Sequence, residues 1–184
     1  HMSLDEPFSG LFTQGMVTHE TYKDSSGNWL FPEEVMLDGN NPVHIKTGDA
    51  VTIGPIESMS KSKKNIIDPQ SIVETFGADT ARWFILSDTP PERDIQWSDE
   101  GMLTSYKFIQ KISSLNDKIF DICKLKQSEN KVEIDIFTNH IINKTNQSLE
   151  KFRYNVIIAI FYEIYSFYRK ISEENKNYKN IKEN

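Results

Sequence analysis

The chain has 184 residues, a formal net charge of −6 at pH 7 and 38% hydrophobic residues, enough for one large or two small domains with a core. It contains neither an apolar run near the roughly 20 residues that span a bilayer nor a charged-then-apolar leader, so we expect a cytoplasmic protein without membrane contact. Cys123 is the only cysteine, which excludes an internal disulfide and a cysteine-based metal cluster.

The first predicted element is an extended strand within residues 11–23, where β-branched and aromatic side chains are frequent. Residues 24–28, with the sequence Asp-Ser-Ser-Gly-Asn, predict a turn directly after it. The chain is therefore predicted to begin with β structure.

Residues 29–56 continue this pattern as short strands joined by tight turns. The turn candidates are residues 38–42 and 47–49, which contain glycine, asparagine, proline and aspartate. The predicted strand pair around the second turn joins residues 43–46 to residues 50–53.

A basic loop follows, with the sequence Ser-Met-Ser-Lys-Ser-Lys-Lys-Asn at residues 58–65. No helical or strand period fits it, and its serines favour turns, which predicts an exposed loop. Lys61, Lys63 and Lys64 lie within four positions, so such a loop can close around phosphate even in an acidic protein. The alternative interpretation is an ordinary solvated basic loop.

Two short helices are predicted after the loop. Asp68 and Pro69 suit the start of the first, because aspartate accepts from free amide groups and proline fits the first turn. Gly77 suits its end. Residues 78–88 predict the second helix, and Pro90 with Pro91 stops it.

The remaining chain has a helical period. Ser98 predicts the start of a helix, and one apolar face recurs at steps of three and four at Phe108, Ile112, Leu115, Ile119 and Ile122. A polar break at 127–131, a helix over 134–150 and a last helix over 152–171 follow. The last helix has an apolar arc too wide for one neighbour, which predicts exposed apolar surface or a non-native dimer. The tail from Glu173 is predicted to be disordered.

Five blocks follow one another along residues 59–101: Met-Ser-Lys-Ser at 59–62, Asn-Ile-Ile-Asp-Pro-Gln at 65–70, Phe-Gly-Ala-Asp-Thr-Ala-Arg at 76–82, Pro-Pro-Glu-Arg-Asp at 90–94 and Gln-Trp-Ser-Asp-Glu-Gly at 96–101. Together they resemble the signature loop and following segment of class I aminoacyl-tRNA synthetases. The resemblance is closest to the bacterial leucyl-tRNA synthetase family, and it covers about residues 11–171. The valine and isoleucine enzymes usually have Leu-Gly-Asn where this chain has Lys63-Lys64-Asn65.

The resemblance implies an α+β fold in three segments. Residues 1–57 would be the end of a Rossmann-like catalytic domain with a reduced β insert. Residues 58–101 would be the signature loop and stem-contact helices, and residues 102–184 the start of an antiparallel anticodon-binding helical bundle with a disordered tail.

The resemblance also implies the chemistry of the site. Lys61 would be the catalytic residue, facing the ATP phosphates, and Gly15 and Met16 would offer backbone on the substrate side, although an ordinary bulge explains Gly15 equally well. The family usually has lysine where this chain has Ser58, a loss that Lys63 would partly compensate. The ATP-binding residues would be Ser58, Met59, Ser60, Lys61 and Ser62.

The implied substrates and partners are ATP with Mg²⁺, leucine and tRNA(Leu). No metal site is expected in the protein, because His44 has no second metal-binding residue at useful spacing. No His-Ile-Gly-His motif occurs, so we expect a fragment of a leucine–tRNA ligase that is inactive alone. A free-standing tRNA- or RNA-binding module and a regulatory synthetase paralogue are the alternatives.

Overall fold

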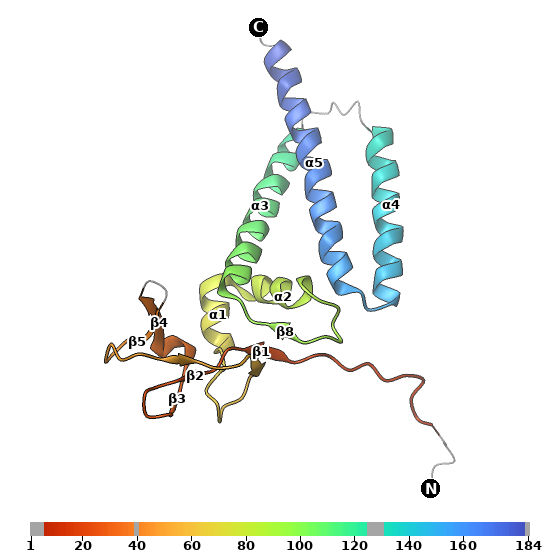
Figure 1. Cartoon of the computed structure of the whole chain (residues 1–184). Helices are drawn as coiled ribbons and strands as arrows, with labels where there is room; N and C mark the ends of the chain where they lie inside the picture. Colours follow the sequence, from red (N-terminus) through yellow and green to blue (C-terminus); the bar gives the residue numbers. More distant parts are fainter. Residues whose placement is uncertain (1–5, 39–40, 125–130, 183–184) are drawn as a thin grey trace. The chain divides into compact units, whose positions relative to one another are not determined.

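The computed structural model describes residues 6–38, 41–124 and 131–182, except for the side chains of residues 37, 121–124, 131 and 174–182. The chain forms two compact units (Figure 1). Unit 1 runs to Ile67 and includes Pro91–Trp97, and unit 2 contains Asp68–Pro90 and the chain from Ser98. The units cut across the three predicted segments, whose assignment to parts of a synthetase stays a prediction. The α+β class is confirmed.

Unit 1 contains the sheet that carries the basic loop. Its central strand β1 (Val17–His19) pairs antiparallel with β7 (Glu57–Ser58) and parallel with β8 (Ile95–Gln96). Segments distant in sequence therefore meet on both sides of β1.

Unit 1 also contains two further small sheets. One has the order β3 (Trp29–Leu30), β2 (Tyr22–Lys23), β6 (Thr52–Ile53), and the other pairs β4 (Val35–Asp38) with β5 (Asn41–His44). A 3₁₀ turn, η1 (Pro32–Glu34), precedes β4.

Two predictions for unit 1 need correction. The strand predicted within residues 11–23 is divided into β1 and β2. The predicted pairing of 43–46 with 50–53 is reduced to one bridge between Val43 and Ala50, because β5 pairs with β4 and β6 pairs with β2. The turn at 47–49 is present, with Gly48 at φ +74°.

Unit 2 begins with α1 (Pro69–Phe76) and α2 (Ala78–Ser87). The Asp68 carboxylate accepts from the backbone N–H groups of Gln70 and Ser71 at 3.2 and 3.3 Å, which satisfies two donors of the first turn. Gly77 ends α1 and starts α2 at φ +83° and ψ 152°. The predicted start and end of α1 are confirmed.

Three long helices follow: α3 (Asp99–Lys124), α4 (Lys131–Glu150) and α5 (Tyr154–Lys182). As predicted, Ser98 caps α3, with its hydroxyl accepting from Gly101 N–H at 3.1 Å. Helices α2, α3 and α5 pack on one another, and α4 packs on α5 (Figure 1). The buried hydrophobic residues of this unit are Phe84, Met102, Phe108, Leu115, Ile141, Ile158, Ile160 and Ile171.

Helix boundaries differ from prediction in three places. Helix α4 begins at Lys131 rather than at 134, and most of the predicted break at 127–131 lies outside the described residues. Phe152 has φ +53°, so α5 starts two residues later than predicted. Helix α5 continues to Lys182, through the tail predicted to be disordered from Glu173.

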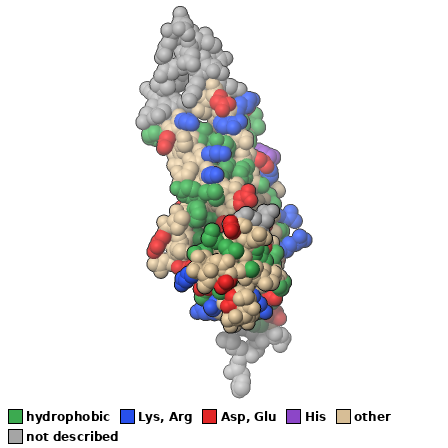
Figure 2. All heavy atoms as spheres, turned by 60° about the vertical axis from the view of Figure 1, so that its left-hand side comes forward, with side chains coloured by type: hydrophobic (Ala, Val, Ile, Leu, Met, Phe, Trp, Pro, Cys, Tyr) green, Lys and Arg blue, Asp and Glu red, His purple; other side chains and the backbone are tan. Residues whose placement is uncertain are grey.

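Hydrophobic side chains reach the surface of unit 2, and several are visible on the face in Figure 2. On α5, Phe161 and Tyr162 are 40% and 42% exposed, in line with the predicted exposed apolar surface. The dimer that would cover it stays a prediction. None of the described helices is long and apolar enough to cross a membrane.

Candidate functional site

The basic loop leaves β7 at Ser58 and returns at Asn65. Met59 N–H donates to the Val17 carbonyl at 3.0 Å, which holds the start of the loop on β1. Residues 61–64 form a turn, and Lys64 has a positive φ of 55°. The predicted exposed loop is therefore present, and both of its ends lie beside β1.

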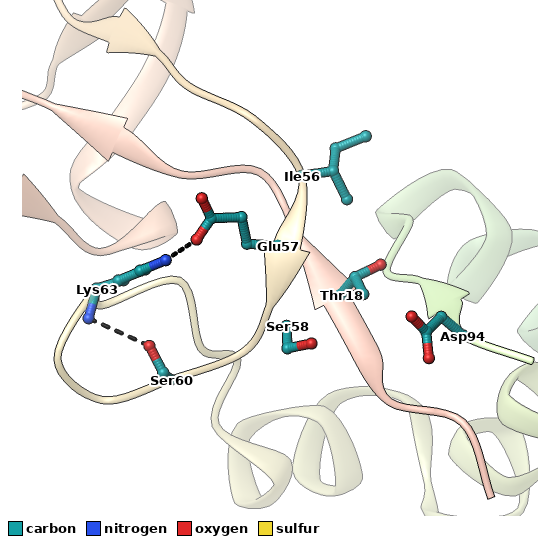
Figure 3. Close-up of a pocket in the computed structure, with 7 residues that line it drawn as sticks. All are labelled: Thr18, Ile56, Glu57, Ser58, Ser60, Lys63 and Asp94. Carbon is teal, nitrogen blue, oxygen red and sulfur yellow. Dashed lines mark hydrogen bonds and ion pairs between the residues drawn. The ribbon is translucent and has the colours of Figure 1, made fainter.

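An open pocket of about 600 Å³ lies beside the loop in unit 1 (Figure 3). Of the predicted ATP-binding residues, Ser58 and Ser60 line this pocket, while Met59, Lys61 and Ser62 do not. Its full lining is Thr18, Ile56, Glu57, Ser58, Ser60, Lys63 and Asp94.

The pocket itself is not a phosphate site by charge. It contains the carboxylates of Glu57 and Asp94 against one ammonium group, that of Lys63. Two negative charges beside one positive charge do not attract an anion. The lining of this pocket therefore does not favour a phosphate, and the contact of Lys61 with phosphate stays a prediction.

The three loop lysines have different environments. The Lys63 ammonium pairs with the Glu57 carboxylate, as the dashed line in Figure 3 marks. The Lys64 ammonium lies over the Phe31 ring, 5.0 Å from its centroid, in a cation–π contact. Lys61 is exposed, and within the described parts of the chain its ammonium has no hydrogen bond, ion pair or ring contact. Lys61 is thus the lysine of this loop that can meet a ligand without breaking an existing contact.

The predicted compensation by Lys63 for the family lysine replaced by Ser58 finds no support in this arrangement. Glu57 already balances the Lys63 charge, and both side chains are only about one-third exposed, at 39% and 34%. A phosphate would have to displace this carboxylate before Lys63 could act as a second free cation.

Gly15 and Met16 have clear structural partners. Gly15 N–H donates to the Pro91 carbonyl at 2.8 Å, and a Cβ atom at Gly15 would lie 2.0 Å from the Arg93 carbonyl oxygen. Met16 N–H donates to an Asp94 carboxylate oxygen at 2.8 Å. The chain's own backbone therefore accounts for Gly15, and the substrate-side role of both residues stays a prediction.

Two residues of this site were missed from the sequence. Asn65 is fully buried under the loop. The Asp94 carboxylate accepts a hydrogen bond from Met16 N–H, and Asp94 lines the pocket. Asn65 belongs to a polar loop and Asp94 to a turn-like segment, so periodicity carries no signal for either. Only the matching blocks at 65–70 and 90–94 marked these stretches as special.

The described residues contain no group of three or more histidine, cysteine, aspartate or glutamate side chains that could hold a metal ion. His44 is half-buried at the end of β5, where its ring nitrogen Nδ1 lies 3.2 Å from the Thr47 hydroxyl.

Comparison with known proteins gives one consistent result. The family model for class I tRNA synthetases (I, L, M and V) matches residues 50–98. A leucine–tRNA ligase of Granulibacter bethesdensis is 41% identical over 182 residues, covering 96% of this chain and 20% of the relative. The leucine–tRNA ligase of Gluconobacter oxydans is 44% identical over 168 residues, covering 90% of this chain and 19% of the relative.

A solved structure agrees in fold. The crystal structure of a ternary complex of LeuRS from Agrobacterium radiobacter K84 with tRNA and LeuAMS matches 91% of this chain with a TM-score of 0.63, at 23% identity. The match covers 18% of that chain. This chain therefore spans about one-fifth of the length of its relatives. It belongs to the leucine–tRNA ligase family of class I tRNA synthetases and corresponds to a segment of about one-fifth of those enzymes.

Proposed function

We propose that this chain supplies the phosphate-facing loop of a leucine–tRNA ligase, which joins leucine to tRNA(Leu) in two steps. The observation that carries the proposal is the exposed ammonium group of Lys61, which has no partner among the described residues. The other two lysines of the loop already have partners, since Lys63 pairs with Glu57 and Lys64 lies over the Phe31 ring. The identity of more than 40% to leucine–tRNA ligases supports the choice of amino acid.

In the first step, a leucine carboxylate oxygen attacks the α-phosphorus of ATP. A new phosphorus–oxygen bond forms, the bond to the bridging oxygen of the β-phosphate breaks, and pyrophosphate leaves with the electron pair. The carboxylate is already ionised at neutral pH, so no general base is required. The remaining demand is to stabilise the charge that grows on pyrophosphate.

Lys61 meets that demand. An ammonium group placed at the leaving phosphates stabilises the transition state more than bound ATP, because negative charge increases there during the reaction. Ser60 and Ser62 would add hydroxyl hydrogen bonds to phosphate oxygens. Mg²⁺ would accompany the ATP phosphates, since it is a hard cation that prefers oxygen ligands.

The remaining assignments belong to the same proposal. Unit 1 corresponds to the end of a catalytic domain with a reduced β insert, α1 and α2 to the stem-contact part, and the long helices to the start of the anticodon-binding bundle. The site of action would be the cytoplasm, where translation takes place.

The test is a chimera in which this chain replaces the corresponding segment of the Gluconobacter oxydans ligase. We expect the chimera to catalyse leucine-dependent exchange between ATP and pyrophosphate. Lys61→Ala should lower kcat by about 10²–10³-fold, a magnitude typical for a group that stabilises transition-state charge, with little change in KM for ATP.

Lys46→Ala is the matched control, since Lys46 is an exposed lysine of unit 1 on a turn outside the loop. It should leave the exchange rate unchanged. A raised KM with unchanged kcat in Lys61→Ala would show uniform ATP binding instead of the proposed role. Salt-sensitive tRNA affinity of the 184-residue chain alone would favour the RNA-binding alternative.

A further inference from the structure

The Asn65 side chain is buried at the base of the loop, with 0% of its surface exposed. Its oxygen Oδ1 accepts a hydrogen bond from the Ser60 backbone N–H at 2.9 Å. Its nitrogen Nδ2 lies 3.1 Å from the Glu57 carbonyl oxygen, 3.3 Å from that of His19 and 3.4 Å from that of Ser58. One side chain thus connects β1 and β7 to the start of the loop.

These contacts require the chemistry of asparagine. An asparagine side chain offers one carbonyl acceptor and two N–H donors, which match the Ser60 N–H and the surrounding carbonyl oxygens. Aspartate at neutral pH could accept from Ser60 but not donate, and it would bury a negative charge beside those carbonyls. Alanine would leave the partly buried Ser60 N–H without this partner.

Two hydrogen bonds at the base of the loop are short: Ser60 N–H donates to Asn65 Oδ1 at 2.9 Å, and Met59 N–H donates to the Val17 carbonyl at 3.0 Å. The hydrogen bonds within the loop are longer than these two. The Ser60 and Ser62 hydroxyl oxygens lie 3.3 Å apart, and Lys63 N–H donates to the Ser60 hydroxyl at 3.4 Å. Lys64 N–H donates to the Lys61 carbonyl at 3.4 Å. Common N–H···O distances are about 2.9–3.0 Å, so the hydrogen bonds of the turn at 61–64 are weaker than the Ser60–Asn65 and Met59–Val17 hydrogen bonds at its base.

We infer that Asn65 is a positioning residue for Lys61, an inference that rests on the proposed function. Asn65 fixes both ends of the loop to the sheet, so that Lys61 approaches the ATP phosphates from a fixed base. Asn65 acts through the loop rather than on the substrate. Without this anchor the ammonium group samples more positions, and fewer of them stabilise the leaving group.

Amide hydrogen exchange of the 184-residue chain tests the anchor by itself. Asn65→Ala should raise the exchange rate of the Ser60 N–H by about tenfold, the factor that one net hydrogen bond corresponds to. Asn65→Ser replaces it if the alanine variant does not fold. Asn139→Ala, at an exposed position of α4, is the control. An unchanged Ser60 exchange rate would overturn the inference.

A double-mutant cycle in the chimera tests the link to Lys61. Asn65→Asp should lower kcat of ATP–pyrophosphate exchange by about 10–100-fold with a nearly constant KM for ATP, and should cost little more in the Lys61→Ala background. Losses that simply multiply would overturn the positioning role. If Lys61→Ala alone had no effect, the proposed function would fail instead, and the Ser60 exchange rate would still decide on the anchor.

Discussion

Gly15 lies directly against the Arg93 peptide, so that a Cβ atom at Gly15 would be 2.0 Å from the Arg93 carbonyl oxygen and 2.6 Å from the Asp94 nitrogen. The Gly15 N–H donates to the Pro91 carbonyl in the same contact. No backbone pair tolerates a carbon atom at this separation without moving apart. The approach of residues 91–97 to the strand β1 therefore depends on the missing side chain.

Gly15→Ala should consequently destabilise unit 1. We expect a loss of about 1–3 kcal/mol in the free energy of unfolding, the usual magnitude for atoms inserted into a packed site. Urea unfolding of the 184-residue chain measures this loss. Gly10→Ala is the matched control, because no atom lies within 4 Å of a Cβ there. Equal stability of both variants would show that the two segments separate freely.

Gly77 presents the opposite case, since a Cβ atom would meet nothing within 4 Å. Its backbone, at φ +83° and ψ 152°, lies in a region that is essentially restricted to glycine. Gly77→Ala should therefore cost about 1–3 kcal/mol through backbone strain alone. Thermal unfolding followed by helical circular dichroism checks this, again beside Gly10→Ala. A variant as stable as the parent would mean that α1 and α2 can be joined by another conformation.

The helices of unit 2 were predictable because their signals are local. Asp68, Gly77 and Ser98 mark helix ends through hydrogen bonds to residues two to four positions away, and apolar side chains recur with the helical period. The β pairings of unit 1 depend on contacts between distant segments. The sequence around Val43 and Ala50 predicts a hairpin, but only one bridge forms there. The two strands pair elsewhere, β5 with β4 and β6 with β2.

The candidate site divides in the same way. The loop and Lys61 follow from composition and family resemblance, whereas the partners of Lys63 and Lys64 do not, because Glu57 and Phe31 are ordinary residues in the sequence. Asn65 is the clearest example. A buried polar residue leaves no periodic trace, and only its hydrogen-bond partners reveal what it does.

Asp24 gives a prediction about pH. The hydrogen bond from the Asn28 side chain lowers the pKa of Asp24 below its usual value, and the backbone N–H groups of Asn28 and Ser26 contribute in the same direction. A lowered pKa in the folded state stabilises the turn above the unfolded pKa, and this stabilisation disappears as pH falls through the folded pKa.

Asn28→Ala should raise the pKa of Asp24 toward its usual value, because the largest contribution is removed. Titration of the Asp24 carboxyl carbon by NMR measures the change. Asn139→Ala, in the other unit, should leave that titration as it is in the parent chain. An unshifted Asp24 pKa in Asn28→Ala would assign the effect to the backbone donors.

Glu57 and Lys63 form the ion pair beside the loop, and both are partly exposed to solvent. Such pairs contribute up to about 1 kcal/mol, so the fold should tolerate the loss of either partner. Their more important effect is on charge. The Glu57 carboxylate neutralises the positive charge of Lys63, so that Lys63 attracts a nearby phosphate less strongly.

Glu57→Gln in the chimera should therefore lower KM for ATP by about two- to fivefold, the factor that corresponds to an exposed ion pair. The gain should vanish in Glu57→Gln with Lys63→Ala, because the released ammonium is then absent. It should also shrink as ionic strength rises, since exposed charges are screened. Glu33→Gln, which removes an exposed carboxylate of unit 1 outside the pocket, is the control. If the gain persists without Lys63, the cause is the general negative charge of Glu57, and Lys63 has no part in binding ATP.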